Sequence, residues 1–325
     1  LFGIIEELKT NGVSIIYISH RMDELMRIGD FITILRDGRL IEARPMDDID
    51  LKWIVATMIG GNSENFFHSE PHKIGEPILE VKDLQLPSST ETMTLDGVSF
   101  VLRKGEILGI FGLMGAGRTE TLETIMGLHR NATGDVILQG KNLAPLGIQE
   151  RIRIGISLVP EDRQREGLVP TMSVSSNMTL AGLWRILIRG FHIGSRKEQD
   201  KVQEMIAKMS IKTPRPDYLI TSLSGGNQQK VIIGKNLITE PKVLMLDEPT
   251  RGIDVGAKAE VFHIVNTLAA EGLGIIFVSS ELKEIRSISD RIIVLSRGRV
   301  SGEFTRHEAT EENLVAASAK AHAHN

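Results

Sequence analysis

The sequence predicts an α/β fold, and three observations carry that prediction. Residues 107–112 form an apolar run that passes into a glycine-rich loop and then into a helical pattern. A second apolar run, at 243–246, ends in two adjacent carboxylates. A strand-and-helix segment at 15–39 returns later in the chain as 275–299. Buried strands that alternate with helical patterns are typical of α/β domains.

Length and composition narrow the range of functions. A chain of 325 residues can hold one full domain and a piece of another. The net charge of −4 gives the chain no overall positive potential, so we expect no nucleic-acid partner. The absence of cysteine excludes disulfides and thiolate metal sites. No apolar run reaches the roughly 20 residues that span a bilayer, so any membrane association should come through a partner.

The repeat predicts the domain organisation. Its two copies differ by a constant 260 positions and share 10 identities in 25 aligned positions. Solenoid repeats are about 20–50 residues long, so this period indicates duplicated domains. Because Leu1 lies inside an amphipathic helical pattern, we expect the chain to be part of a longer protein. The predicted divisions are the C-terminal part of a first domain (1–60), a polar linker (61–76), a second domain (77–305) and a tail (306–325).

A phosphate-binding loop is predicted where the apolar run at 107–112 ends. Strand, glycine loop and helix is the context that such a loop requires, because its backbone amides curl around phosphate oxygens. Thr119 is placed to bind Mg²⁺. Arg118 stands where a lysine is expected. Its planar guanidinium differs in shape from the compact ammonium of lysine, so we expect nucleotide binding to be retained but hydrolysis to be in doubt. The alternative is a glycine-rich turn that connects the strand to the helix and binds no phosphate. The candidate phosphate-binding residues are Gly112, Gly115, Ala116, Gly117, Arg118 and Thr119.

The paired carboxylates supply the candidate metal ligand and catalytic residue. Asp247 should hold Mg²⁺, and Glu248 should polarise an attacking water beside a phosphate. The alternative is an acidic pair in a turn before Pro249. Upstream, Ser224, Gly225 and Gly226 open a helical run and offer backbone N–H groups to an anion.

The runs LSGGNQQK and LMLDEPTRGID resemble the signature motif, Walker B strand and D-loop of ABC-type ATPases. This resemblance implies a P-loop NTPase fold of the ABC type, with an antiparallel β subdomain and a helical subdomain at about 162–222. It implies that the helical subdomain faces a transmembrane partner, and that Asp254, in the D-loop, signals across a domain interface.

The same resemblance identifies departures from the pattern in the second domain. Glu161 stands where these ATPases usually carry a nucleotide-sensing glutamine; alternatively it is a solvated loop acid. Ser280 falls where they place a histidine that contacts the γ-phosphate, and the repeat puts His20 at the equivalent position of the first copy. On its own, His20 could be an ordinary surface histidine. No aromatic residue occurs between Leu84 and Asp96, where adenine usually stacks.

Because ABC domains pair head to tail around ATP, these departures imply two unequal sites. Residues 224–226 would complete the active site of the first domain, together with His20. The pocket of the second domain would hold nucleotide and turn it over slowly.

The segments GLMGAGRTE, VPEDR, LSGGNQQK, DEPTRGIDVGAK and SSEL resemble the second half of the double ATPase subunits of bacterial monosaccharide importers, of the ribose, galactose, arabinose and xylose type. The resemblance implies ATP and Mg²⁺ as cofactors and ATP hydrolysis that energises import of a pentose, hexose or related polyol. It implies two permease subunits, indirectly a sugar-binding protein, and a peripheral location on the cytoplasmic face of the inner membrane. Two alternatives remain: a ribosome-associated tandem ABC ATPase, and a nucleotide-binding scaffold without turnover.

Overall fold

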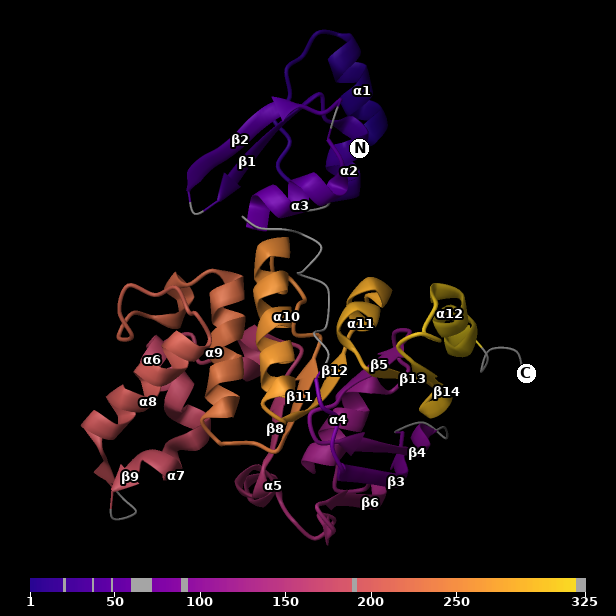
Figure 1. Cartoon of the computed structure of the whole chain (residues 1–325), viewed down its shortest axis with the longest axis vertical. Helices are drawn as coiled ribbons and strands as arrows, with labels where there is room; N and C mark the ends of the chain where they lie inside the picture. The colour runs from indigo at the N-terminus through magenta and orange to yellow at the C-terminus, as the bar shows by residue number, and fades with distance from the viewer. Residues whose placement is uncertain are drawn as a thin grey trace.

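The computed structural model describes residues 1–19, 22–36, 38–47, 49–59, 72–88, 93–188 and 192–319. Figure 1 shows a small N-terminal unit at the top and a larger unit below it, to which all elements from β3 onward belong. The small unit consists of α1 (Phe2–Thr10), α2 (Met22–Ile28), β1 (Phe31–Arg36), β2 (Arg39–Pro45) and α3 (Leu51–Ile59).

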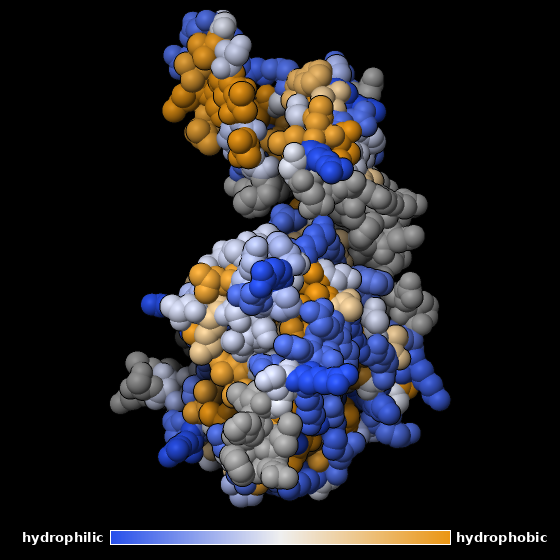
Figure 2. All heavy atoms as spheres, turned by 90° about the vertical axis from the view of Figure 1, so that its left-hand side faces the viewer, coloured by the Kyte–Doolittle hydropathy of each residue, from blue (hydrophilic) through white to orange (hydrophobic). Residues whose placement is uncertain are grey.

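The N-terminal unit has a small core and a large apolar surface. Its buried cluster consists of only Ile32, Ile34, Ile49 and Ile54 among the described residues. Ile16 and Ile18 are 93% and 92% exposed. Figure 2 shows the resulting apolar surface, drawn in orange, over the upper part of the molecule. Exposed apolar area of this kind marks a surface that another element covers.

The larger unit is built on a six-stranded sheet with the order β14-β13-β5-β12-β11-β8. The first five strands along the chain run parallel, and β14 pairs antiparallel with β13. Every residue of β5, β11 and β12 is buried, as expected for a parallel sheet covered on both faces. This confirms the predicted α/β class. The strands are β5 (Ile107–Gly112), β8 (Ile156–Val159), β11 (Val243–Asp247), β12 (Gly274–Val278), β13 (Arg291–Ser296) and β14 (Arg299–Thr305).

Alternate residues of the central strands face two different cores. One face packs on the helices α9 (Gly225–Leu237), α10 (Val255–Ala270) and α11 (Leu282–Ile288). The other face packs on α4 (Arg118–Met126) and on an antiparallel sheet with the order β4-β3-β6-β7. This second sheet is the antiparallel β subdomain that the sequence predicted. Its strands are β3 (Pro77–Pro87), β4 (Met93–Arg103), β6 (Thr133–Leu138) and β7 (Lys141–Asn142).

Between β8 and α9 the chain is mainly helical, in agreement with the predicted helical subdomain. A short hairpin interrupts it. The elements here are η2 (Arg163–Gly167), α6 (Val174–Thr179), η3 (Leu180–Gly182), α7 (Leu183–Ile186), β9 (Leu187–Ile188), β10 (His192–Ile193), α8 (Ser195–Lys208) and η4 (Ile220–Ser222). The remaining helices are α5 (Ile148–Ile154) and α12 (Glu311–Ala319). Within the parts of the chain that the structure describes, no helix is long and apolar enough to cross a bilayer.

The repeat in the sequence is also a repeat of structure. The elements α2, β1, β2 and α3 have the bounds of α11, β13, β14 and α12 minus 260. Both hairpins even shift register at the equivalent place, between Ile34 and Leu35 and between Val294 and Leu295. Local sequence therefore specifies these elements in the same way in both units.

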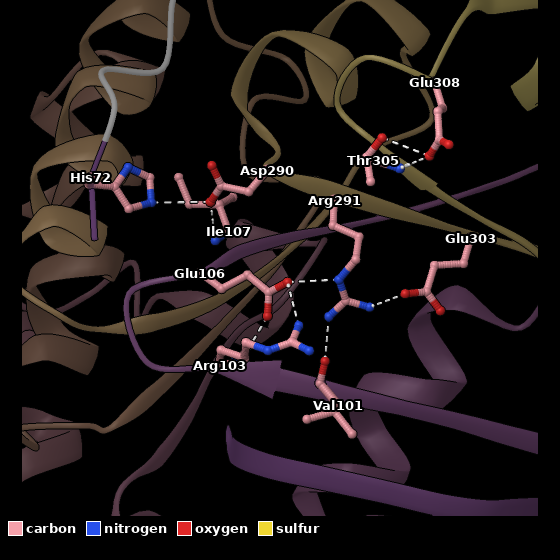
Figure 3. Close-up of polar contacts among 10 residues, drawn as sticks. All are labelled: His72, Val101, Arg103, Glu106, Ile107, Asp290, Arg291, Glu303, Thr305 and Glu308. Atoms are coloured by element: carbon pink, nitrogen blue, oxygen red, sulfur yellow. Dashed lines mark hydrogen bonds and ion pairs between the residues drawn. The ribbon is translucent and has the colours of Figure 1, made fainter. Parts of the chain in front are cut away.

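A buried polar network ties the strands of the second unit together (Figure 3). The Glu106 carboxylate, in a residue 1% exposed, accepts from Arg291 Nε at 2.8 Å and from the Arg103 amide at 2.7 Å. Arg291 also donates to the Val101 carbonyl at 2.5 Å. Because these partners come from β4, β13 and the turn before β5, the network fixes the two sheets at one end of the molecule.

Candidate functional site

The glycine loop between β5 and α4 is shaped by backbone constraints. Gly115 and Gly117 have φ angles of +76° and +95°, a region that side chains rarely tolerate. A Cβ on Gly112 would lie 2.6 Å from the Leu295 carbonyl oxygen, so this position has no room for a side chain. The Ala116 amide donates within the loop, to Leu113 at 3.0 Å. No side chain caps the start of α4, which leaves its first amides available to an anion.

Thr119 and Asp247 meet at the carboxyl ends of β5 and β11. The Thr119 hydroxyl donates to Asp247 Oδ2 at 2.8 Å. The other carboxylate oxygen, Oδ1, is buried and has no hydrogen-bond partner within the described part of the chain. Burial raises the pKa of the Asp247 carboxyl to about 6. A hydroxyl beside a buried, unsatisfied carboxylate oxygen is a donor set that fits Mg²⁺, because this ion prefers hard oxygen ligands.

The Glu248 side chain pairs with Arg118 and is largely shielded from solvent. Arg118 Nη1 lies 2.9 Å from Glu248 Oε1, and the two side chains are only 15% and 8% exposed. The Glu248 backbone has φ +44°, which is uncommon outside glycine, and its amide donates to the Val278 carbonyl at 3.0 Å. The strand end thus fixes the position of Glu248, and the arginine in the lysine position neutralises its charge.

A cavity of about 810 Å³ opens beside these residues and contains Thr119, Asp247 and Glu161 in its lining. Glu161 forms an ion pair with Arg251, which also lines the cavity. Glu123 also lines the cavity. Sequence reasoning missed Glu123, although its spacing of four from Thr119 on α4 places both on one helix face and could have identified it.

The predicted anion-contacting residues 224–226 lie outside this cavity. Ser224 is exposed and begins α9 without a side-chain cap. A Cβ on Gly226 would collide with Ala257 of α10, so a glycine is required for the close approach of the two helices. The start of α9 is therefore presented to the surface and not to the loop of its own unit.

The remaining predicted site residues are distributed around the sheet. Asp254 is exposed and caps α10 by accepting from the Ala257 amide at 2.9 Å. Ser280 is exposed and follows β12. His20 lies outside the described residues. The structure thus brings Arg118, Thr119, Glu161, Asp247 and Glu248 together, and it places residues 224–226, Asp254 and Ser280 elsewhere.

Comparisons with known proteins agree with this architecture. Residues 95–251 match the family model described as ABC transporter. The crystal structure of a nucleotide-free ATP-binding cassette from an ABC transporter superposes with a TM-score of 0.64 at 22% identity, over 74% of this chain and 98% of that one. The matched part of the chain therefore resembles the ABC transporter family, and the chain has the fold of an ATP-binding cassette.

Similarity to individual proteins extends further along the chain. It is 43% identical over 321 residues to the xylose import ATP-binding protein XylG of Pseudomonas savastanoi pv. phaseolicola, and 42% identical to the protein of the same name from Brucella melitensis. Both alignments cover 98% of this chain, which spans 62% and 63% of the relatives' lengths. The predicted resemblance to ATP-binding subunits of monosaccharide importers is confirmed.

Proposed function

We propose that this chain is the C-terminal part of a subunit that binds and hydrolyses ATP to energise the import of a monosaccharide. The observation that carries the proposal is the meeting of the glycine loop with both carboxylates, through Thr119 to Asp247 and Arg118 to Glu248. Both relatives are named as xylose import ATP-binding proteins. Xylose is therefore the first sugar to test, among pentoses, hexoses and related polyols.

The residues of the site would have separate roles in ATP binding and hydrolysis. The loop amides and the start of α4 would hold phosphate oxygens, because no side chain caps this helix start. Thr119 and Asp247 would hold Mg²⁺, which when bound neutralises phosphate charge. Glu248, at the end of the same strand as Asp247, is the group that would polarise an attacking water.

The pocket of the second domain is poorly equipped for turnover. The side chain that should polarise water is paired with Arg118 at 2.9 Å. Ser280, at the position of the phosphate-contacting histidine, supplies no cation. Loss of one preorganised contact of this kind typically costs on the order of 10²–10³ in rate. We therefore infer that this pocket holds ATP and hydrolyses it slowly.

The exposed start of α9 serves a different site in this proposal. Residues 224–226 are not part of the lining of their own unit's cavity and would close on the phosphate loop of the first domain, where His20 would contact the γ-phosphate. Asp254, at the start of α10, would face the same interface. The mostly helical region 162–222 would contact one of two permease subunits at the cytoplasmic face of the inner membrane, and a sugar-binding protein would deliver the sugar from the other side.

The asymmetry can be tested in the full-length protein, reconstituted with its permease. Glu248→Gln should leave most of the ATPase activity, because the first domain still turns over. The matching change in the first domain should remove nearly all of it. If Glu248→Gln caused the larger loss, the assignment of the slow pocket would be wrong.

A second experiment tests the transport role. A deletion strain should lose uptake of labelled xylose and recover it with the wild-type gene, and the subunit should co-purify with a membrane permease. The Arg118–Glu248 pair also suits a nucleotide-binding scaffold without turnover. That alternative predicts normal uptake when Glu248 and the matching glutamate of the first domain are both changed to glutamine. The transport proposal predicts no uptake in this variant.

A further inference from the structure

Arg163, the first residue of η2 after β8, connects parts of the molecule that are far apart in sequence. Its Nη1 donates to the Arg251 carbonyl at 2.8 Å, and its Nη2 donates to the Gly252 carbonyl at 3.1 Å. Its Nε is buried and has no hydrogen-bond partner among the residues that the structure describes. The planar guanidinium thus holds two successive carbonyls of the D-loop, a task that requires its fixed fork of donors.

The same guanidinium lies at the start of α9. A Cβ on Gly225 would be 3.0 Å from Arg163 Nη2, so the side chain packs directly against this glycine. The next residue, Gln164, donates from Nε2 to Gln228 Oε1 at 2.7 Å. Gln228 belongs to α9 and is 7% exposed. Two neighbouring side chains of one loop therefore fix the first turns of α9.

The turn that carries Arg163 is held in shape and lines the cavity. Asp162 accepts from the amides of Gln164 and Arg165 at 3.0 and 3.1 Å, which fixes the turn that presents Arg163. Residues 161–164 all line the cavity, and Glu161 pairs with the side chain of Arg251. Four consecutive residues thus join the cavity of the second unit to the D-loop and to α9.

From these contacts we propose that Arg163 is a positioning residue for the nucleotide bound by the first domain. This inference rests on the proposed function, in which the D-loop and residues 224–226 face that nucleotide. Arg163 lines the cavity of its own unit, but it acts on the nucleotide of the first domain only through these elements. By holding the D-loop carbonyls against Gly225, it keeps both elements in one rigid arrangement. Through Glu161, that arrangement is connected to the second pocket.

The test measures ATPase kinetics of the full-length protein with its permease. Arg163→Gln should lower kcat by about 10²-fold, because small misplacements of positioning groups have effects of this size. The Kd for ATP at the first domain should change less than about twofold, since the phosphate loop of that domain is untouched. Arg163→Lys should recover only part of the loss, because a compact ammonium cannot replace the fork.

Arg165→Gln is the matched control, because Arg165 is exposed, lies in the same turn and uses only its backbone N–H in the described contacts. It should leave kcat and Kd unchanged. An Arg163→Gln protein with wild-type kcat, or with equal losses in kcat and ATP affinity, would overturn the proposal. If that variant folds poorly, the same comparison of kcat with Kd in Arg163→Lys decides.

A further variant separates this inference from the proposed function. Ser224→Arg places a bulky side chain at the exposed start of α9 and should abolish ATPase activity if this region closes on the first domain. Activity that survives Ser224→Arg would refute the proposed function. Activity lost with Ser224→Arg but retained with Arg163→Gln would refute only the role of Arg163.

Discussion

Residues 14–18 and 274–278 are equivalent segments of the repeat, and they differ completely in structure. The second segment forms β12, between β5 and β11, and Ile276 and Val278 are 0% exposed. In the first segment, Ile16 and Ile18 are 93% and 92% exposed, and the backbone forms no strand. A strand needs neighbours on its hydrogen-bonding edges, and the first copy has none among the described residues. Strand formation here is therefore decided by tertiary partners.

The hairpins and helices behave in the opposite way. β1 and β2 pair with the same register as β13 and β14, although only the second hairpin joins a larger sheet. The two strands of a hairpin are neighbours in sequence, so each supplies the partner of the other. Elements that contact residues nearby in the sequence form without the rest of a domain. Elements that need contacts with residues far away in the sequence do not.

Amide exchange should give the largest difference between the copies. The amides of 275–278 should exchange at least about 10³-fold more slowly than those of 15–18, because a central strand opens only with global unfolding. Hydrogen exchange with mass spectrometry measures this. In the full-length protein of the proposed function, in which a complete first domain would surround this segment, protection of 15–18 should rise. Equal protection of both segments in the present chain would contradict the comparison.

The buried ion network should show the next largest effect. Arg291→Met leaves the Glu106 carboxylate buried without its main partner, and we expect the free energy of unfolding to fall by about 3–5 kcal/mol. The equivalent residue in the first copy is Phe31, which is 60% exposed. Phe31→Arg should therefore change stability by about 0.5 kcal/mol or less.

Urea denaturation checks this prediction, because each unit carries one tryptophan, Trp53 or Trp184. Adding Glu106→Gln to Arg291→Met should recover part of the loss, since no charge is then left buried. A double variant less stable than the single one would show that the charge is not the cause.

Paired substitutions of isoleucine compare the two sheets directly. Ile276→Ala should lower the free energy of unfolding by about 2–5 kcal/mol, because it leaves a cavity in a packed core. Ile16→Ala, at the equivalent exposed position, should change it by about 0.5 kcal/mol or less. The same urea curves measure both, and similar losses at the two positions would rule out the difference in packing.

The pH dependence of stability should be a property of the second unit. The pKa of Asp247 is raised to about 6, so between pH 4 and 6 the folded state binds more protons than the unfolded state. The free energy of unfolding should therefore fall as pH rises through this window, by about 2–3 kcal/mol. Asp247→Asn should remove this decrease from the Trp184 signal. Persistence of the full decrease in that variant would assign it to other groups.

Sequence reasoning anticipated much of the site, for identifiable reasons. The glycine loop and the pair Asp247–Glu248 are compact motifs whose function depends on neighbouring residues, so spacing alone reveals them. The pairing of Arg118 with Glu248 joins residues 130 positions apart, and no local pattern encodes it. Glu161 could be assigned to the candidate site, but its ion pair with Arg251 depends on how the D-loop packs against the residues that follow β8.

By itself, the sequence determined the repeated elements, the local hairpins and helices, and the positions of the candidate nucleotide-binding motifs, because short-range patterns specify all of these. Only the tertiary structure decided that Glu248 pairs with Arg118, that Arg163 connects the D-loop to α9, and that one copy of an equivalent strand pattern remains unpaired. The physical reason is that strand pairing and buried ion pairs require partners brought together by packing, from positions that no local pattern connects.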